Sequence, residues 1–197
     1  MRLNQEIYTH IMRQLDKLPA TLTYHTKGHV LDVLEQAGQI ARLEGITGEK
    51  ELELLQLAIL YHDIGFLYLY KGHEEASCEI ARDELKEFGI STTDIESICG
   101  LIMATRIPQT PRNKLEEIIC DADLDYLGRD DFFPTAHNLF LEMKFYGYLE
   151  REEEWNRIQV SFLEQHHYFT STNQQRRAPK KRVHLNMIKM IVSSADH

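Results

Sequence analysis

The chain has 197 residues, of which 43% are hydrophobic and 27% charged, and its formal net charge is −9. This length suffices for one domain with a full hydrophobic core, and we expect residues 1–197 to form a single domain. The negative balance argues against a general nucleic-acid binder, because phosphate backbones require a basic face, and no apolar run approaches the ~20 residues that span a bilayer.

Apolar residues recur at helical spacing along nearly the whole chain. These stripes predict helices over residues 7–18, 30–40, 52–61, 76–85, 95–105, 115–126, 132–146, 151–169 and 183–191. Ser91, followed three residues later by Asp94, is typical of a helix N-cap. Because no run of alternating residues indicates a substantial sheet, we expect an all-α fold. The role of the local basic cluster in residues 176–182 stays open.

Cysteine usage and the start of the chain favour a cytoplasmic protein. Three widely spaced cysteines without a CxxC pair (Cys78, Cys99 and Cys120) are typical of reduced thiols. Residues 1–10 lack the apolar core of a signal peptide.

One predicted helix leads directly into a histidine and a carboxylate, His62 and Asp63. Burying an unpaired carboxylate costs several kcal/mol, and a divalent metal satisfies a neutral imidazole and a carboxylate together. Successive helical residues differ by roughly 100° about the axis, so one ion between these two side chains is within reach of both. His29 and Asp123 lie in other predicted helices and can supply further ligands.

The order His29, His62-Asp63, Asp123 resembles the H…HD…D motif of the HD superfamily of metal-dependent phosphohydrolases. The similarity extends to the segments YHTKGHVLDVL, LAILYHDIGFLY and CDADLDYLG, and it covers roughly residues 20–190. It implies a phosphodiesterase-like HD domain, built as a single orthogonal bundle of helices. It also implies hydrolysis of a phosphate mono- or diester, in a nucleotide or a related small metabolite.

The resemblance implies that a divalent metal is held by His29, His62, Asp63 and Asp123. The metal is Mn, Fe, Co, Ni, Zn or Mg, as one ion or two. The family's ligand follows an alanine, which selects Asp123, but Asp121 stays open as the last ligand, a cap or a substrate contact.

The resemblance also assigns roles around the metal. His25 matches the phosphodiesterase histidine that protonates the leaving oxygen, although a partly exposed histidine before a helix is equally typical. Asp63 bridges to a second ion or orients the water, and His73 binds a second ion or contacts substrate. The candidate substrate contacts are Glu74, Arg106 and Asp121.

Two other functional classes stay open: a non-catalytic HD module that binds a nucleotide or a protein, and an HD oxygenase with two irons. The hydrolase interpretation predicts a small phosphorylated substrate as the partner, and neither a membrane nor nucleic acid in general. A homodimer stays open.

Overall fold

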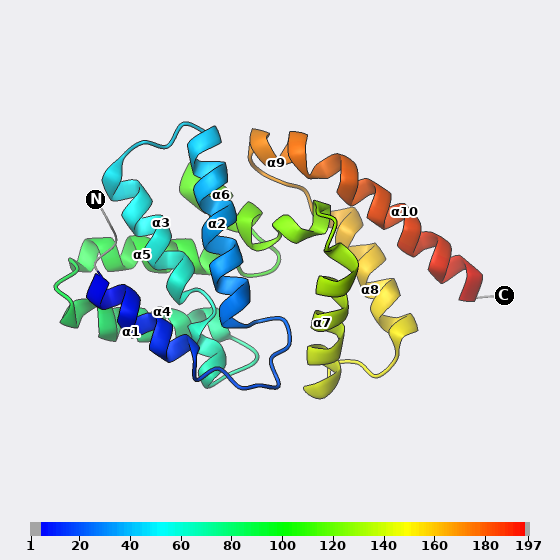
Figure 1. Ribbon diagram of the computed structural model, residues 1–197, viewed down its shortest axis with the longest axis horizontal. Helices are drawn as coiled ribbons and strands as arrows, with labels where there is room; N and C mark the ends of the chain where they lie inside the picture. Colours follow the sequence, from blue (N-terminus) through cyan, green and yellow to red (C-terminus); the bar gives the residue numbers. More distant parts are fainter. Residues whose placement is uncertain (1–4, 196–197) are drawn as a thin grey trace.

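Every regular element in residues 5–195, the part of the chain that the computed structural model describes, is helical (Figure 1). The α-helices are α1 (Gln5–Leu15), α2 (Lys27–Leu43), α3 (Glu49–Tyr61), α4 (His73–Glu87), α5 (Thr92–Ala104), α6 (Lys114–Asp123), α7 (Phe132–Phe145), α8 (Glu152–Gln165), α9 (Ser171–Arg176) and α10 (Ala178–Ala195). Two short 3₁₀ helices, η1 (Ile64–Leu67) and η2 (Asp125–Gly128), follow α3 and α6. The predicted all-α fold is confirmed. Within the described residues, none of these helices is both long and apolar enough to cross a bilayer.

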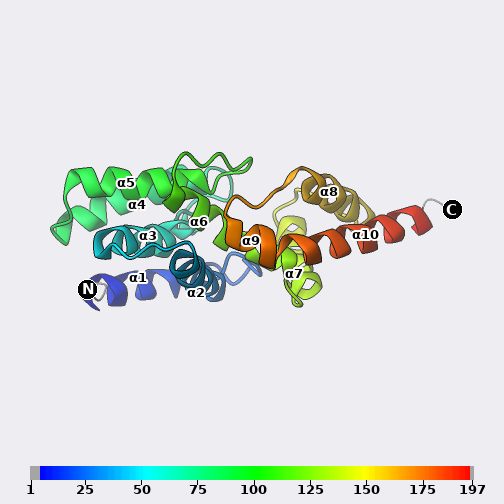
Figure 2. The ribbon, with the colours of Figure 1, turned by 90° about the horizontal axis from the view of Figure 1, so that it is seen from above.

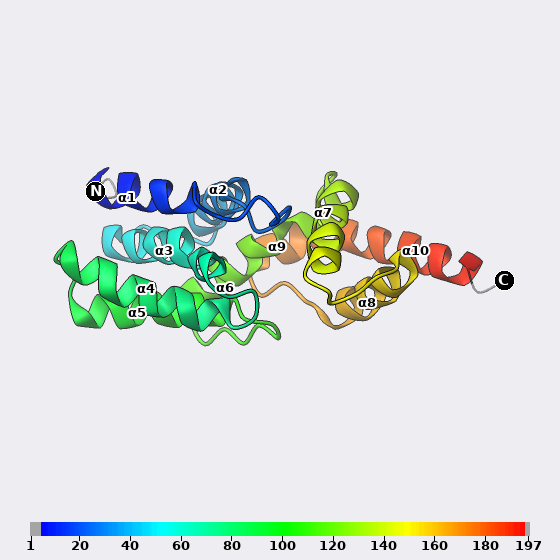
Figure 3. The same ribbon diagram turned by 90° about the horizontal axis from the view of Figure 1, so that it is seen from below.

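The helices gather into two groups, each with its own buried apolar cluster. Helices α1–α6 surround the first cluster, which includes Ile11, Val33 and Leu60. Helices α7, α8 and α10 surround the second together with η2, around side chains such as Phe132 and Trp155. Figures 2 and 3 show the two groups side by side along the long axis of the molecule, with α9 between them.

The start of α2 is set by a side-chain cap. Thr26 has an extended backbone, and its hydroxyl accepts a hydrogen bond from the backbone N–H of His29 at 3.2 Å. Such a cap satisfies one of the N–H groups that have no partner within the helix. Val30 and Val33, on the stripe that α2 buries, then fix its rotation. His29 is thereby held in the first turn.

A glycine allows α4 to approach the segment that follows α3. A Cβ atom on Gly65 would lie 2.0 Å from the carbonyl oxygen of His73, so no larger residue fits here. The Gly65 N–H donates to the Ser77 hydroxyl at 2.9 Å, and that hydroxyl donates to the carbonyl of His62 at 2.7 Å. These contacts place the start of α4 directly beside His62 and Asp63.

The observed helices differ from the predicted ones mainly after residue 120. The predicted helix over residues 151–169 ends at Gln165, and residues 166–169 belong to no helix. The short helix α9 was not predicted, and α10 is longer than expected. The stripe over residues 115–126 is broken after Asp123, where η2 begins. The N-cap at Ser91 is confirmed, since its hydroxyl accepts from the Asp94 N–H at 3.2 Å.

Candidate metal centre

Three helices bring four potential metal ligands together. His29 comes from the first turn of α2, His62 and Asp63 from the end of α3, and Asp123 from the end of α6. Nε2 of His29 lies 3.1 Å from Oδ1 of Asp123 and 3.5 Å from Oδ2 of Asp63. Nε2 of His62 lies 3.2 Å from Oδ2 of Asp63 and 3.7 Å from Oδ1 of Asp123. Ligand atoms of His29, His62 and Asp123 all lie within 4.8 Å of one another.

Two polar atoms in this cluster are buried without a hydrogen bond. His62 Nδ1 donates to the carbonyl of Ile59 at 2.7 Å, which leaves Nε2 as a lone pair directed at the cluster. His62 Nε2 and Asp63 Oδ2 both lack a hydrogen-bond partner. Leaving such atoms buried and unsatisfied costs on the order of 1–3 kcal/mol each, or more for a charged group. Two imidazoles and two carboxylates are suitable ligands for a divalent ion, and the backbone hydrogen bond of His62 is the kind that orients a ligating histidine.

The carboxylates of the cluster are ionised at neutral pH. Burial acts to raise the pKa of Asp123, but the neighbouring imidazoles of His29 and His62 outweigh it and lower that pKa to about 2. Burial likewise opposes the charge on Asp63, yet the neighbouring His62 holds the pKa of Asp63 well below its usual range. The site therefore presents two negative charges to a cation.

His25 is held at the edge of the cluster by a buried acid, Glu142 of α7. Oε2 of Glu142 accepts the backbone N–H groups of Tyr24 at 2.8 Å and His25 at 3.0 Å. Oε1 pairs with Nδ1 of His25 and also accepts the Tyr70 hydroxyl at 3.1 Å. Burial acts to lower the pKa of His25, but the hydrogen bond to Glu142 and the charge of Asp63 outweigh it, so the pKa is raised.

Glu142 was missed by the sequence analysis. Its signal is a single acid between Leu141 and Met143 in an otherwise apolar stretch of α7, where the side chain is fully buried. A buried acid within an apolar stripe needs a partner, but the local sequence does not say which one.

His73 faces the second oxygen of Asp63. Nε2 of His73 lies 3.6 Å from Oδ1 of Asp63, and its Nδ1 lies 3.5 Å from Oε2 of Glu74. The rings of His73 and His25 both stack on the ring of Phe66. Burial is the main cause that lowers the pKa of His73, which favours a neutral imidazole able to act as a ligand.

Two of the residues expected to contact substrate have other partners. Asp121 accepts the backbone N–H groups of Phe169 at 2.8 Å and Thr170 at 2.9 Å, and it also accepts the Thr170 hydroxyl. It anchors the segment before α9, because on α6 it faces away from Asp123. Arg106 is more than half exposed, and its guanidinium pairs with Glu75. Neither residue lines the cavity described next, whereas Glu74 does.

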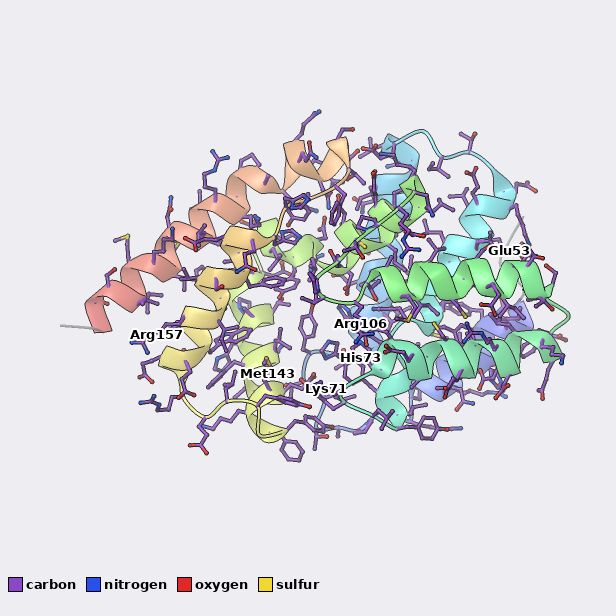
Figure 4. The ribbon with its side chains drawn as sticks, turned by 180° about the vertical axis from the view of Figure 1, so that it is seen from behind. Glu53, Lys71, His73, Arg106, Met143 and Arg157 are labelled. Atoms are coloured by element: carbon purple, nitrogen blue, oxygen red, sulfur yellow. The ribbon has the colours of Figure 1, made fainter. Side chains whose placement is uncertain are left out.

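A cavity of about 300 Å³ opens beside the metal ligands. Asp63, Asp123, His25 and His73 line one end of it, and side chains of η2, α7 and α8 make up most of the rest of the lining. Figure 4 shows His73 and Met143, both in its lining, on opposite sides of the space between the two helix groups. A small organic molecule can therefore reach the ligand cluster while it contacts the second group.

Comparison with known proteins identifies the family. The model of the HD domain matches residues 26–126, just over half of the chain, and this stretch contains all four candidate ligands. No curated protein and no solved structure matches the chain significantly. Metal-dependent phosphohydrolases are the general kind of protein in this family. The chain therefore belongs to the HD domain family.

Proposed function

We propose that this protein hydrolyses a phosphate mono- or diester of a small molecule with the help of a bound divalent metal. The observation that carries the proposal is the cluster of His29, His62, Asp63 and Asp123, in which two buried ligand atoms have no partner. The cluster opens into a cavity of ligand size, and a histidine held by a buried carboxylate lines that cavity.

The four clustered side chains would hold the ion. Imidazole nitrogens together with carboxylate oxygens suit Mn, Fe, Co, Ni or Zn. Mg prefers oxygen ligands and is therefore the least favoured of the expected ions. The second oxygen of Asp63, Oδ1, faces Nε2 of His73 at 3.6 Å, whereas Oδ2 is the oxygen that lies near His29 and His62. This pair of ligand atoms supports a second ion between Asp63 and His73. A bound ion would supply a water of lowered pKa and would polarise the phosphoryl oxygen.

A residue of the chain can supply the proton that the leaving oxygen needs. In the hydrolysis, water oxygen bonds to phosphorus, the bond between phosphorus and the ester oxygen breaks, and that oxygen needs a proton to leave as an alcohol. His25 is suited to give it, since Glu142 fixes its Nδ1 and favours the protonated ring. Phe66 stacks on the His25 ring with the ring centroids 4.2 Å apart, and this contact helps to hold the ring in place. The proton released by the attacking water restores the balance.

The test is metal-dependent turnover on a panel of phosphate esters and nucleotides. Activity should vanish with a chelator, return with Mn²⁺, Co²⁺, Mg²⁺ or Fe²⁺, and be lost in the double variant His62→Ala with Asp63→Ala. The matched control is His137→Ala, an exposed histidine of α7 outside this cavity, which should keep full activity. A protein that binds metal but turns over no ester would favour the non-catalytic binding module. Oxygen consumption by an iron-loaded protein would favour the oxygenase.

A further inference from the structure

The cavity beside the metal ligands is apolar along most of its length. Its far part is lined by Phe132, Leu139, Met143, Trp155, Phe162 and Leu163. All of these belong to α7 or α8 and lie after residue 126, where the match to the HD domain ends. This wall is therefore a feature of this chain and not of the part that the family model covers.

The same cavity offers little to bind charge away from the ligand cluster. Among the described residues, no lysine or arginine lines it, and its acids are Asp63, Glu74 and Asp123. Gln159 contributes the one amide side chain on the α7 and α8 wall, and its Nε2 already donates to Asn156 at 3.1 Å. Lys181, near α8, donates instead to the carbonyl of Leu163 at 3.1 Å.

The apolar wall and the lack of lysine and arginine in the described lining favour a phosphate ester with a hydrocarbon group over a polyphosphate. Enzymes that bind polyphosphates clamp the additional phosphates with arginine, lysine or metal ions. A second or third phosphoryl group placed in the far part of the cavity would lie against hydrocarbon, without a lysine or arginine of the described lining to neutralise it. A hydrocarbon group in the same place would bury its surface against aromatic and aliphatic side chains, and the volume of about 300 Å³ is at the small end of ligand sites.

We propose that the substrate is an ester of a single phosphoryl group with an uncharged, mostly hydrocarbon alcohol, alkyl or aryl. This rests on the proposed function: the phosphoryl group lies at His29, His62, Asp63 and Asp123, and the organic group lies between α7 and α8. Each further methylene that the substrate buries should multiply kcat/KM by about four, until the cavity is full.

The test is a series of n-alkyl phosphates from ethyl to octyl, compared with AMP and ATP on the Mn²⁺-loaded full chain. We expect kcat/KM to rise about fourfold per methylene over the first additions, and to exceed that for ATP by 100-fold or more for the longer esters. A kcat/KM that does not change with chain length, or that is highest for ATP, would overturn the proposal and leave the hydrolase function intact.

A binding measurement separates this inference from the activity itself. Octylphosphonate should bind at least tenfold more tightly than methylphosphonate by calorimetry, whether or not any ester is hydrolysed. Met143→Gln, which puts an amide in the wall, should reduce this ratio several-fold, while Met187→Gln on the half-exposed face of α10 should not. Equal affinities of the two phosphonates for the wild type would contradict the proposal even if the variant fails to fold.

Discussion

Replacing Glu142 by Gln removes one negative charge from behind His25 with little change in size. The amide oxygen can keep the two backbone N–H groups that Oε2 accepts at 2.8 Å and 3.0 Å. The amide nitrogen then faces Nδ1 of His25, and a hydrogen bond between them requires that Nδ1 is an acceptor and the ring neutral. The Tyr70 hydroxyl can rotate and accept the second amide hydrogen. Because the partners remain, we expect a stability loss of only about 1–3 kcal/mol.

The catalytic loss should be larger. Two unit charges about 4 Å apart interact by about 4 kcal/mol at the effective dielectric constant of a protein site, which is an upper limit for what Glu142 contributes to the protonated ring. General acid catalysis is worth about 10²–10⁴ in rate, equivalent to about 3–5 kcal/mol. These magnitudes agree, so loss of the charge should remove most of the acid catalysis.

The assay compares an alkyl phosphate with an activated nitrophenyl phosphate over a range of pH. Protonated His25 is lost as pH rises, and the pKa that Glu142 raises should fall in Glu142→Gln, so the basic limb of kcat moves to lower pH. At neutral pH kcat for the alkyl ester should fall about 10²–10⁴-fold, while the activated ester and the metal content change little. Glu79→Gln, an exposed acid of α4, is the matched control. An unmoved basic limb, or equal losses on both esters, would refute the role assigned to Glu142.

Three further perturbations test other parts of the account. His25→Ala should keep the metal and lose rate mainly with poor leaving groups, and loss of metal by elemental analysis would instead make His25 a ligand. Burial opposes the charge on Glu44, but hydroxyl and amide groups at the start of α9 outweigh it and lower its pKa to about 2. This contribution is present above pH 4.5 and is lost as pH falls toward 2, so urea unfolding of Glu44→Gln should depend less on pH in that window than that of the wild type. Gly65→Ala should lower the melting temperature or displace His73, because the carbonyl oxygen of His73 would lie 2.0 Å from the new methyl group. Gly38 is exposed, and Gly38→Ala should stabilise α2 by up to about 1 kcal/mol. Equal melting temperatures in the two variants would contradict this.

Local patterns in the sequence predict the helices of the first group and the ligand motif. The spacing of apolar residues along α2 and α3 reflects which face is buried, so it is visible in a single sequence. The His62-Asp63 pair at the end of a buried stripe likewise indicates a metal. The structure places Asp123 rather than Asp121 beside His29, because residues two apart on a helix face in different directions.

The contacts that were missed join residues far apart in the chain. Glu142 binds His25 from 117 positions away, and no local pattern contains that pairing. Residues 166–169 have the composition of a helix end, but Asp121 binds the backbone N–H of Phe169 from 48 positions away and holds the segment out of helix α8. Tertiary hydrogen bonds of this kind outweigh helix propensity, which amounts to only tenths of a kcal/mol per residue.

The most direct test of the metal centre is a crystal structure of the purified protein with an anomalous difference map at the absorption edge of the bound metal. The account predicts a peak within bonding distance of Nε2 of His29, Nε2 of His62 and the carboxylates of Asp63 and Asp123. A metal bound elsewhere in the protein, or these four side chains dispersed around an ion-free site in metal-saturated crystals, would contradict it.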